Sequence, residues 1–179
     1  MKITDLTSNT RRLETSQFVH LPRPEVFAVF SDPRNLEEIT PPWLRFRMTG
    51  QSTPQVGEGT ELRYRLRVHG IPTTWISRIT EWVPEERFVD LQLKGPYTYW
   101  HHRHIFEEQN GGTLIRDQVD FQLPFGKLGS WLGSSMVESD ILKIFRFRAD
   151  RTYDLLRLPA ESFLPGGTWV PSQPPETWH

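Results

Sequence analysis

Hydrophobic and polar residues alternate along the middle of the chain. Between residues 62 and 68 every second residue is apolar, and the residues between them are arginines. A period of two is typical of strands with one buried face. The stretch 44–48 alternates in the same way, and further strands are predicted at 17–21, 73–83, 87–94, 99–107 and 113–123. The short turns between them favour consecutive antiparallel hairpins.

Helical spacing occurs in two regions. Val26, Phe27 and Phe30 share one helical face, and Asp32 followed by Pro33 is typical of the start of a second short helix, which ends before 41–42. From about residue 130 to residue 158 apolar residues recur at helical spacing, and a proline at position 159 ends this long helix.

The order of these elements indicates an α+β fold with two layers. A sheet with one apolar face needs a cover, and the long helix is the only predicted element large enough to supply it. We expect a polar N-terminal segment at 1–14, a single domain at 15–158 and a Pro-rich tail at 159–179. The composition of that tail predicts neither helix nor central strand, although Trp169 and Trp178 offer apolar side chains for docking it.

Composition and charge exclude several classes of function. The chain has 179 residues and no cysteine, which excludes disulfides, thiolate nucleophiles and zinc sites built on cysteine. The formal net charge of −1 gives no global attraction to DNA or to an anionic membrane. The sequence contains no apolar run long enough for a signal peptide or a membrane span, so we expect a cytoplasmic protein.

The strand predicted at 99–107 carries the most informative chemistry. Alternation places His102 and His104 on the same face as Trp100, and the next strand turns Asp117 to that face. If residues 110–111 (Asn-Gly) form a two-residue type I′ turn, His104 lies directly opposite Asp117. A turn one residue later would instead place His104 opposite Val119.

A set of motifs in this region resembles the ligand-binding branch of the SRPBCC superfamily. This superfamily is also called START-like or helix-grip, and it includes polyketide cyclase/dehydrase-type proteins. The resemblance covers residues 15–157 and is carried by Gly95-Pro96-Tyr97, Trp100-x-His102-x-His104-x-Phe106, Gly112-Thr113, Asp117 and Ile144-Phe145-x-x-Arg148. It implies a curved antiparallel sheet of about seven strands wrapped around the C-terminal helix, with a deep cavity for an apolar or amphipathic small molecule.

We therefore expect a binding protein for a hydrophobic, lipid-like or polyketide-like small molecule. Arg148 lies on an apolar helical stripe, so it needs an inward carboxylate or an anionic ligand group, unless its side chain extends to the sheet edge. The expected ligand-binding residues are Trp43, Tyr64, Trp75, Trp100, His102, His104, Phe106, Asp117, Phe121, Ile141, Phe145 and Arg148.

Three alternatives stay open at this point. A His104–Asp117 pair has the parts of a general base for a cyclase or dehydratase. The same histidines with Asp117 are candidate metal ligands, but no spaced metal motif supports them, so we expect neither metal nor cofactor. Five arginines, here called the outer arginine face, offer a surface for RNA, phospholipid or protein; they are Arg45, Arg47, Arg63, Arg65 and Arg67. We expect a monomer or a homodimer.

Overall fold

The structure is a computed structural model that describes residues 1–123 and 126–156, without the side chains of 126–134. Eight strands form one sheet: β1 (Lys2–Asp5), β2 (Arg11–Val19), β3 (Arg47–Gln51), β4 (Glu61–Val68), β5 (Ile71–Val83), β6 (Arg87–Lys94), β7 (Tyr99–Gln109) and β8 (Gly112–Gln122). The described residues also form two α-helices and two 3₁₀ turns: α1 (Arg23–Ser31), η1 (Pro33–Leu36), η2 (Pro42–Leu44) and α2 (Gly126–Leu156).

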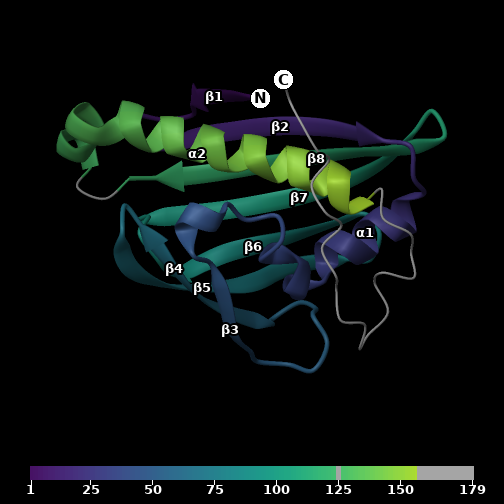
Figure 1. Cartoon of the computed structure of the whole chain (residues 1–179). Coiled ribbons are helices and arrows are strands. Elements are labelled where there is room, and N and C mark those ends of the chain that lie inside the picture. The colour runs from purple at the N-terminus through teal and green to yellow at the C-terminus, as the bar shows by residue number, and fades with distance from the viewer. Residues whose placement is uncertain (124–125, 157–179) are drawn as a thin grey trace, which may run out of the picture.

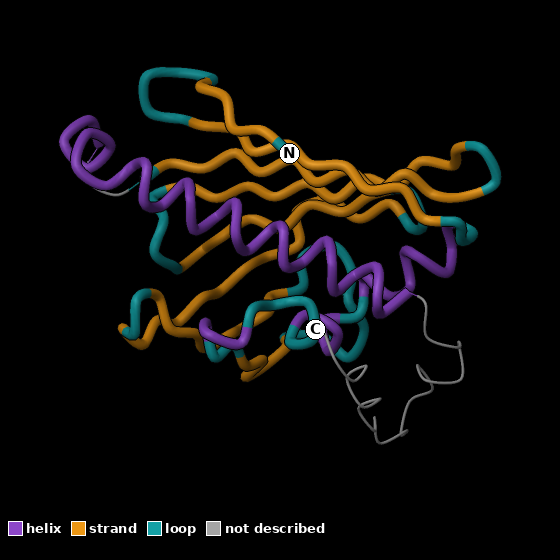
Figure 2. Tube along the Cα trace, turned by 45° about the horizontal axis from the view of Figure 1, so that its top comes forward, coloured by secondary structure: helices purple, strands orange, loops and turns teal. Residues whose placement is uncertain are grey.

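The sheet has the order β1-β2-β8-β7-β6-β5-β4-β3, and every pair is antiparallel. The long helix α2 crosses one face of the curved sheet, and α1 lies near the end of α2 (Figures 1 and 2). This arrangement confirms the helix-grip α+β fold, with eight strands rather than about seven. None of the described helices is both long and apolar enough to span a membrane.

The sheet begins earlier in the chain than predicted. Residues 1–14 were expected to form a separate polar segment, but they contain β1 and the first part of β2, which pairs with β8 along its whole length. The polar pattern concealed this strand because its arginines are neutralised by acidic residues distant in the chain. Arg12 makes a two-pronged ion pair with Asp120 on β8, at 2.6 and 2.7 Å, while Leu13, which follows the two arginines, is fully buried.

The second predicted helix is shorter than expected. Asp32 does cap it, accepting a hydrogen bond from the backbone N–H of Arg34 at 2.9 Å, but the element is a 3₁₀ turn that ends at Leu36. The alternating stretch 44–48 is also a strand only from Arg47 onward. Prolines start a second 3₁₀ turn just before it, and Arg45 ends that turn in the left-handed conformation at φ 46°.

The predicted β7–β8 register is confirmed. Asn110 and Gly111 have positive φ angles of 47° and 76°, as a type I′ turn requires. Gln109 pairs with Gly112 and His104 pairs with Asp117.

Helix α2 buries Ile141 and Phe145 against the inner face of the sheet. It starts at residue 126 rather than 130, and its predicted last residues, like the tail at 159–179 with Trp169 and Trp178, lie outside the described residues. Polar contacts also join α2 to the sheet. Gln17 Nε2 donates to the carbonyl of Ala149 at 2.9 Å, and Arg11 pairs with Glu138.

Candidate functional site

A cavity of about 610 Å³ lies between α2 and the inner faces of the sheet strands, with α1, η1 and η2 contributing to its wall. The alternation of each strand turns large apolar side chains inward, including Tyr64, Trp75 and Trp100. Ile141 and Phe145 extend toward them from the helix. The wall is therefore mainly apolar, with a small number of polar groups.

Nine of the twelve predicted ligand-binding residues line this cavity: Trp43, Tyr64, Trp75, Trp100, His102, His104, Ile141, Phe145 and Arg148. Phe106, Asp117 and Phe121 do not. Phe106 is covered by the rings of Phe27 and Phe30 from α1, and Phe121 packs behind the ring of Trp100. Correct strand alternation placed these side chains on the inner face, but alternation does not show which neighbour then covers each of them.

Two histidines and two aspartates form a polar cluster at the cavity wall, in which His102, His104 and Asp117 are buried and Asp90 is half-buried. His102 Nε2 lies 2.9 Å from Asp117 Oδ1, and His104 Nδ1 lies 3.0 Å from the same oxygen. On their other side His102 Nδ1 and His104 Nε2 lie 3.5 and 3.2 Å from Asp90 Oδ2. Each imidazole therefore lies between the same two carboxylates.

The cluster differs from the predicted His104–Asp117 pair in two respects. The hydrogen bond to Asp117 is made by His102, whereas His104 Nδ1 approaches the same oxygen outside hydrogen-bonding geometry. The reason is that the two imidazoles are packed together, with ring centroids 3.7 Å apart, so both approach one carboxylate oxygen. In addition, His104 has a hydrogen-bonding partner that the register did not indicate, Asp90, at 3.2 Å.

Burial and charge set different protonation tendencies for these groups. Burial and the neighbouring His104 lower the pKa of His102 to about 4, so this imidazole is neutral. Burial also opposes charge on His104, but Asp117 and Asp90 outweigh it and keep the pKa of His104 above its usual value. Burial would raise the pKa of Asp117, yet the hydrogen bond from His102 and the proximity of His104 hold it well below the usual range.

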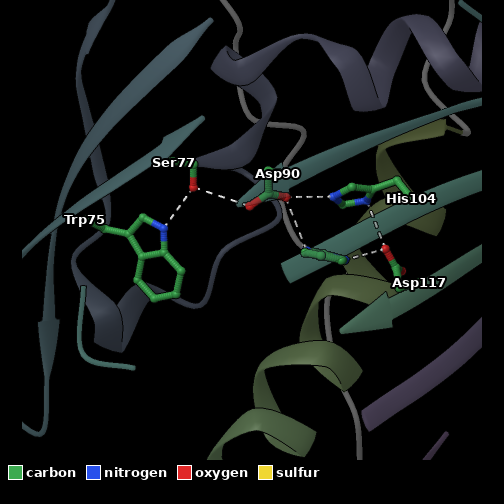
Figure 3. Close-up of polar contacts among 6 residues, drawn as sticks. Trp75, Ser77, Asp90, His104 and Asp117 are labelled. Atoms are coloured by element: carbon green, nitrogen blue, oxygen red, sulfur yellow. Dashed lines mark hydrogen bonds and ion pairs between the residues drawn. The ribbon is translucent and has the colours of Figure 1, made fainter. Parts of the chain in front are cut away.

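Asp90 and Ser77 extend the cluster along the cavity wall, and no role for Asp90 was predicted from the sequence. Trp75 Nε1 donates to Ser77 Oγ at 2.9 Å, and Ser77 Oγ lies 3.3 Å from Asp90 Oδ1 (Figure 3). A signal for Asp90 was present, because alternation in β6 places it on the same face as the buried Phe88. Its contact with Ser77 is diagonal, because Asp90 pairs with Ile79 and Ser77 pairs with Gln92 in the bulged β5–β6 register.

Arg148 is a cation in the cavity wall with no matching anion. No carboxylate of the described residues lies within 4.0 Å of its guanidinium, and its Nε is buried without a hydrogen-bond partner among them. Its Cζ lies 5.2 Å from the ring centre of Phe145. Burial lowers the pKa of Arg148, while Asp117 and Asp90 partly offset that effect. Of the outcomes predicted for Arg148, pairing with an inward carboxylate does not occur within the described part of the chain.

One part of the cavity rim is closed by a contact between the β4–β5 turn and α2. His69 Nε2 lies 3.0 Å from Asp140 Oδ2, and both residues line the cavity. His69 and Gly70 form the turn with φ angles of 49° and 81°. Trp43 also lines the cavity, although its side chain is 57% exposed. We therefore place Trp43 at the rim rather than in the interior.

The outer arginine face is exposed, and its members differ in pairing. Arg47 forms an ion pair with Glu37 at 2.6 Å, and Arg63 approaches Glu61 at 3.9 Å. Within the described residues the other three members, Arg45, Arg65 and Arg67, have no acidic group within 4.0 Å. Arg47 and Arg65 are register partners, which brings two like charges together. A macromolecular partner for this face stays a prediction.

Comparison with known proteins supports the fold. A family model described as polyketide cyclase/dehydrase and lipid transport matches residues 19–145. No curated protein matches the chain.

Solved structures of low identity share the fold. The Zhui aromatase/cyclase from a Streptomyces species is 19% identical, with a TM-score of 0.65, 82% of this chain covered and 93% of that one. The protein CV1439 from Chromobacterium violaceum is 12% identical (TM-score 0.64, 83% and 99% covered), and Ara h 8.0201 is 14% identical (TM-score 0.60, 82% and 97% covered).

Proposed function

The chain belongs to the polyketide cyclase/dehydrase and lipid transport family, and from this premise we propose that it binds a hydrophobic or amphipathic small molecule between the sheet and α2. The observation that carries the proposal is the cavity. Ligand sites generally have volumes of about 300–1,000 Å³, mainly apolar walls and a few polar groups that orient the ligand. The volume of about 610 Å³ and the composition of the wall agree with each of these properties.

The polar groups favour a ligand with one anionic or strongly electronegative end. Arg148 has a buried Nε without a partner among the described residues. A buried cation is costly unless an anion or acceptor lies close to it. A carboxylate, phenolate or enolate on the ligand would supply that partner, while the remainder of the molecule fills the space among Tyr64, Trp75 and Trp100.

The binding proposal is tested by filling the cavity. Ile144 lines the cavity and is not fully buried, so Ile144→Trp places a larger side chain in the empty space without displacing the core. The matched control is Arg146→Trp on the exposed side of the same helix. With 1-anilinonaphthalene-8-sulfonate as the fluorescent probe, we expect saturable binding to the wild type and the control and at least a tenfold weaker affinity for Ile144→Trp. Equal affinity in all three proteins would contradict the proposal.

The natural ligand is then identified by native mass spectrometry of the protein purified from its own host. A stoichiometric compound that disappears in Ile144→Trp supports the proposal and identifies the molecule.

We further propose a monomer or homodimer located in the cytoplasm, as the sequence predicted.

A second candidate function is cyclisation or dehydration of a polyketide-like substrate. It is supported by the fold shared with the Zhui aromatase/cyclase and by a basic imidazole on the cavity wall, His104, with Asp117 behind it. A carboxylate that fixes the tautomer of an imidazole is a common feature of general bases. If this function holds, His104→Ala abolishes conversion of the compound released from the native protein but still binds the fluorescent probe. Unchanged conversion in His104→Ala would exclude this role.

A further inference from the structure

Asp90, His102 and His104 combine the donor atoms of a metal site. One donor atom from each of the three lies within 4.8 Å of the other two. His102 Nδ1 and His104 Nε2 lie 3.5 and 3.2 Å from Asp90 Oδ2. Two ligands held about 2.0–2.1 Å from a tetrahedral zinc ion are about 3.4 Å apart. The two imidazole–carboxylate separations therefore already match those of bound ligands.

Asp117 orients both imidazoles for such a site. His102 Nε2 is hydrogen-bonded to Asp117 Oδ1, which places the proton of the neutral ring on Nε2 and leaves the lone pair of His102 Nδ1 facing Asp90. His104 Nε2 is hydrogen-bonded to Asp90, so a metal ion would have to displace the proton of this nitrogen. The proton of His104 would then be carried by Nδ1, which lies 3.0 Å from Asp117 Oδ1. Metal-binding histidines commonly donate their other N–H to a carboxylate in this way.

The location of the cluster leaves a coordination position open. Asp90, His102 and His104 all line the cavity, whereas Asp117 lies behind them. Three protein ligands with a fourth position open to a cavity are typical of zinc sites that act on a bound molecule, in contrast to closed structural sites. Two imidazoles and one carboxylate suit first-row transition metals better than Ca²⁺ or Mg²⁺, which prefer oxygen ligands.

We propose that Asp90, His102 and His104 bind one divalent transition-metal ion, with Asp117 orienting the two histidines and the open coordination position facing the cavity. An electronegative oxygen of the cavity ligand can occupy that position. The site was not expected from the sequence, because its ligands come from β6 and β7 and Asp90 belongs to no spaced motif.

The charges of the proposed metal ion and of Arg148 both favour a ligand with an anionic group. With Asp90 and Asp117 negative, a divalent ion together with Arg148 leaves one net positive charge at the wall, which an anionic ligand group would neutralise. A proton is the competing occupant of the same position, as an imidazolium at His104 that contacts both carboxylates. The two occupants differ in a measurable way, because only the metal links His102 Nδ1 and His104 Nε2 to one centre.

The test measures metal binding alone, so it is independent of whether the cavity binds a small molecule. The full chain is freed of metal by chelation and then titrated with Zn²⁺, and bound ion is counted by mass spectrometry after equilibrium dialysis. We expect one Zn²⁺ per chain in the wild type and loss of that ion in Asp90→Asn and His104→Gln. Asp117→Asn should bind about 10- to 100-fold more weakly, as expected for a residue that orients metal ligands.

The matched control is His101→Gln, because His101 lies on the opposite face of the same strand as His102 and lacks a place in the cluster. This variant should keep the ion. Retention of the full stoichiometry in Asp90→Asn and His104→Gln, or absence of bound Zn²⁺ in the wild type, would overturn the proposal.

A second measurement needs no variant and therefore does not depend on the variants folding. Nitrogen NMR of the imidazole side chains in the wild type should show that Zn²⁺ shifts Nδ1 of His102 and Nε2 of His104, while their partner nitrogens keep their protons. Co²⁺ in place of Zn²⁺ should produce the absorption bands of a four-coordinate ion. Unmoved imidazole resonances at saturating Zn²⁺ would contradict the proposed ligands.

Discussion

Asp117 and Asp120 lie on the same strand and face opposite sides of the sheet. They show how the surroundings of a carboxylate determine its contribution to the stability of the fold. Asp117 is buried against His102 and His104, and it lies 2.9 and 3.0 Å from their nitrogens. Asp120 pairs with Arg12 on the partly exposed outer side. The Arg12–Asp120 pair keeps access to water, whereas the buried carboxylate of Asp117 depends on protein groups alone for stabilisation of its charge.

We therefore predict that Asp117→Asn destabilises the protein more than Asp120→Asn. Breaking a buried charge cluster by removing one partner generally costs about 3–5 kcal/mol, and loss of a partly exposed ion pair costs about 1 kcal/mol or less. Urea unfolding of metal-free protein measures both values. Equal losses for the two variants would show that the inner cluster does not stabilise the fold.

Arg148 permits a second prediction at the level of single residues. Arg148→Met keeps the length and apolar stem of the side chain and removes its charge. We expect the affinity for the anionic probe 1-anilinonaphthalene-8-sulfonate to fall at least tenfold, because the side chain at position 148 no longer offers a cation to the sulfonate. Binding of the neutral probe Nile red should change less than threefold. A parallel loss for both probes would mean that Arg148 acts by shaping the cavity.

At the scale of elements, the β7–β8 hairpin determines which side chains meet at the cavity wall. Gly111 needs its positive φ angle of 76°, and space is open beside it. Gly112 has no such angle, but a β-carbon there would overlap the carbonyl oxygen of Val19 and the ring of Phe18. The first glycine is required by the turn and the second by the close packing of β2 against β8.

We predict that Gly112→Ala destabilises the protein more than Gly111→Ala. Overpacking against a backbone atom costs about 1–3 kcal/mol and shifts the strands, while a left-handed alanine in open space costs about 1 kcal/mol. Thermal unfolding of both variants provides the comparison. The reverse order would indicate that the turn conformation matters more than the contact between β2 and β8.

The elements also explain what the sequence was able to predict. The pairing of His104 with Asp117 followed from local information, because the Asn-Gly turn fixes the register of a hairpin. The full extent of strand β2 could not be predicted from local information. Its arginines pair with Asp120 and Glu138, which are far away in the chain. Sequence patterns reveal periodicity and turn chemistry, but they do not identify partners that only the tertiary fold brings together.

The same limit applies to the candidate site. Alternation identified the inward faces of β7 and β8, and nine of the predicted residues do line the cavity. Asp90 was missed because its approach to His102 and His104 depends on the pairing of β6 with β7. Phe106 and Phe121 were misplaced because the helix and rings that cover them cannot be read from strand periodicity.

At the scale of the whole molecule, the cavity lies beneath α2 and replaces part of the packing that would otherwise join the helix to the sheet. The contacts that join α2 to the sheet include the buried Ile141 and Phe145, the hydrogen bond from Gln17 to Ala149, and the ion pairs Arg11–Glu138 and His69–Asp140. A ligand in the cavity adds contacts to both layers at once.

We predict that ligand binding slows hydrogen exchange mainly in α2 and in the β4–β5 turn. Strands β7 and β8, which pair along their whole length, should change little. A ligand at 100 times its dissociation constant stabilises the folded state by about 2.7 kcal/mol. Hydrogen–deuterium exchange with and without 1-anilinonaphthalene-8-sulfonate measures the distribution, and uniform slowing over all strands would contradict a ligand seated beneath the helix.

The two outermost strands have a consequence for how copies of the protein meet. An open sheet edge offers unpaired backbone groups to other chains, and this promotes aggregation. Here β1 has only four residues, and β3 has five, with a bulge between Met48 and Gly50 and the charged Arg47 at its start. Short, bulged and charged edges oppose the addition of a further strand. The sheet is therefore poorly suited to joining a second copy edge to edge, and self-association by continuous strand pairing is disfavoured.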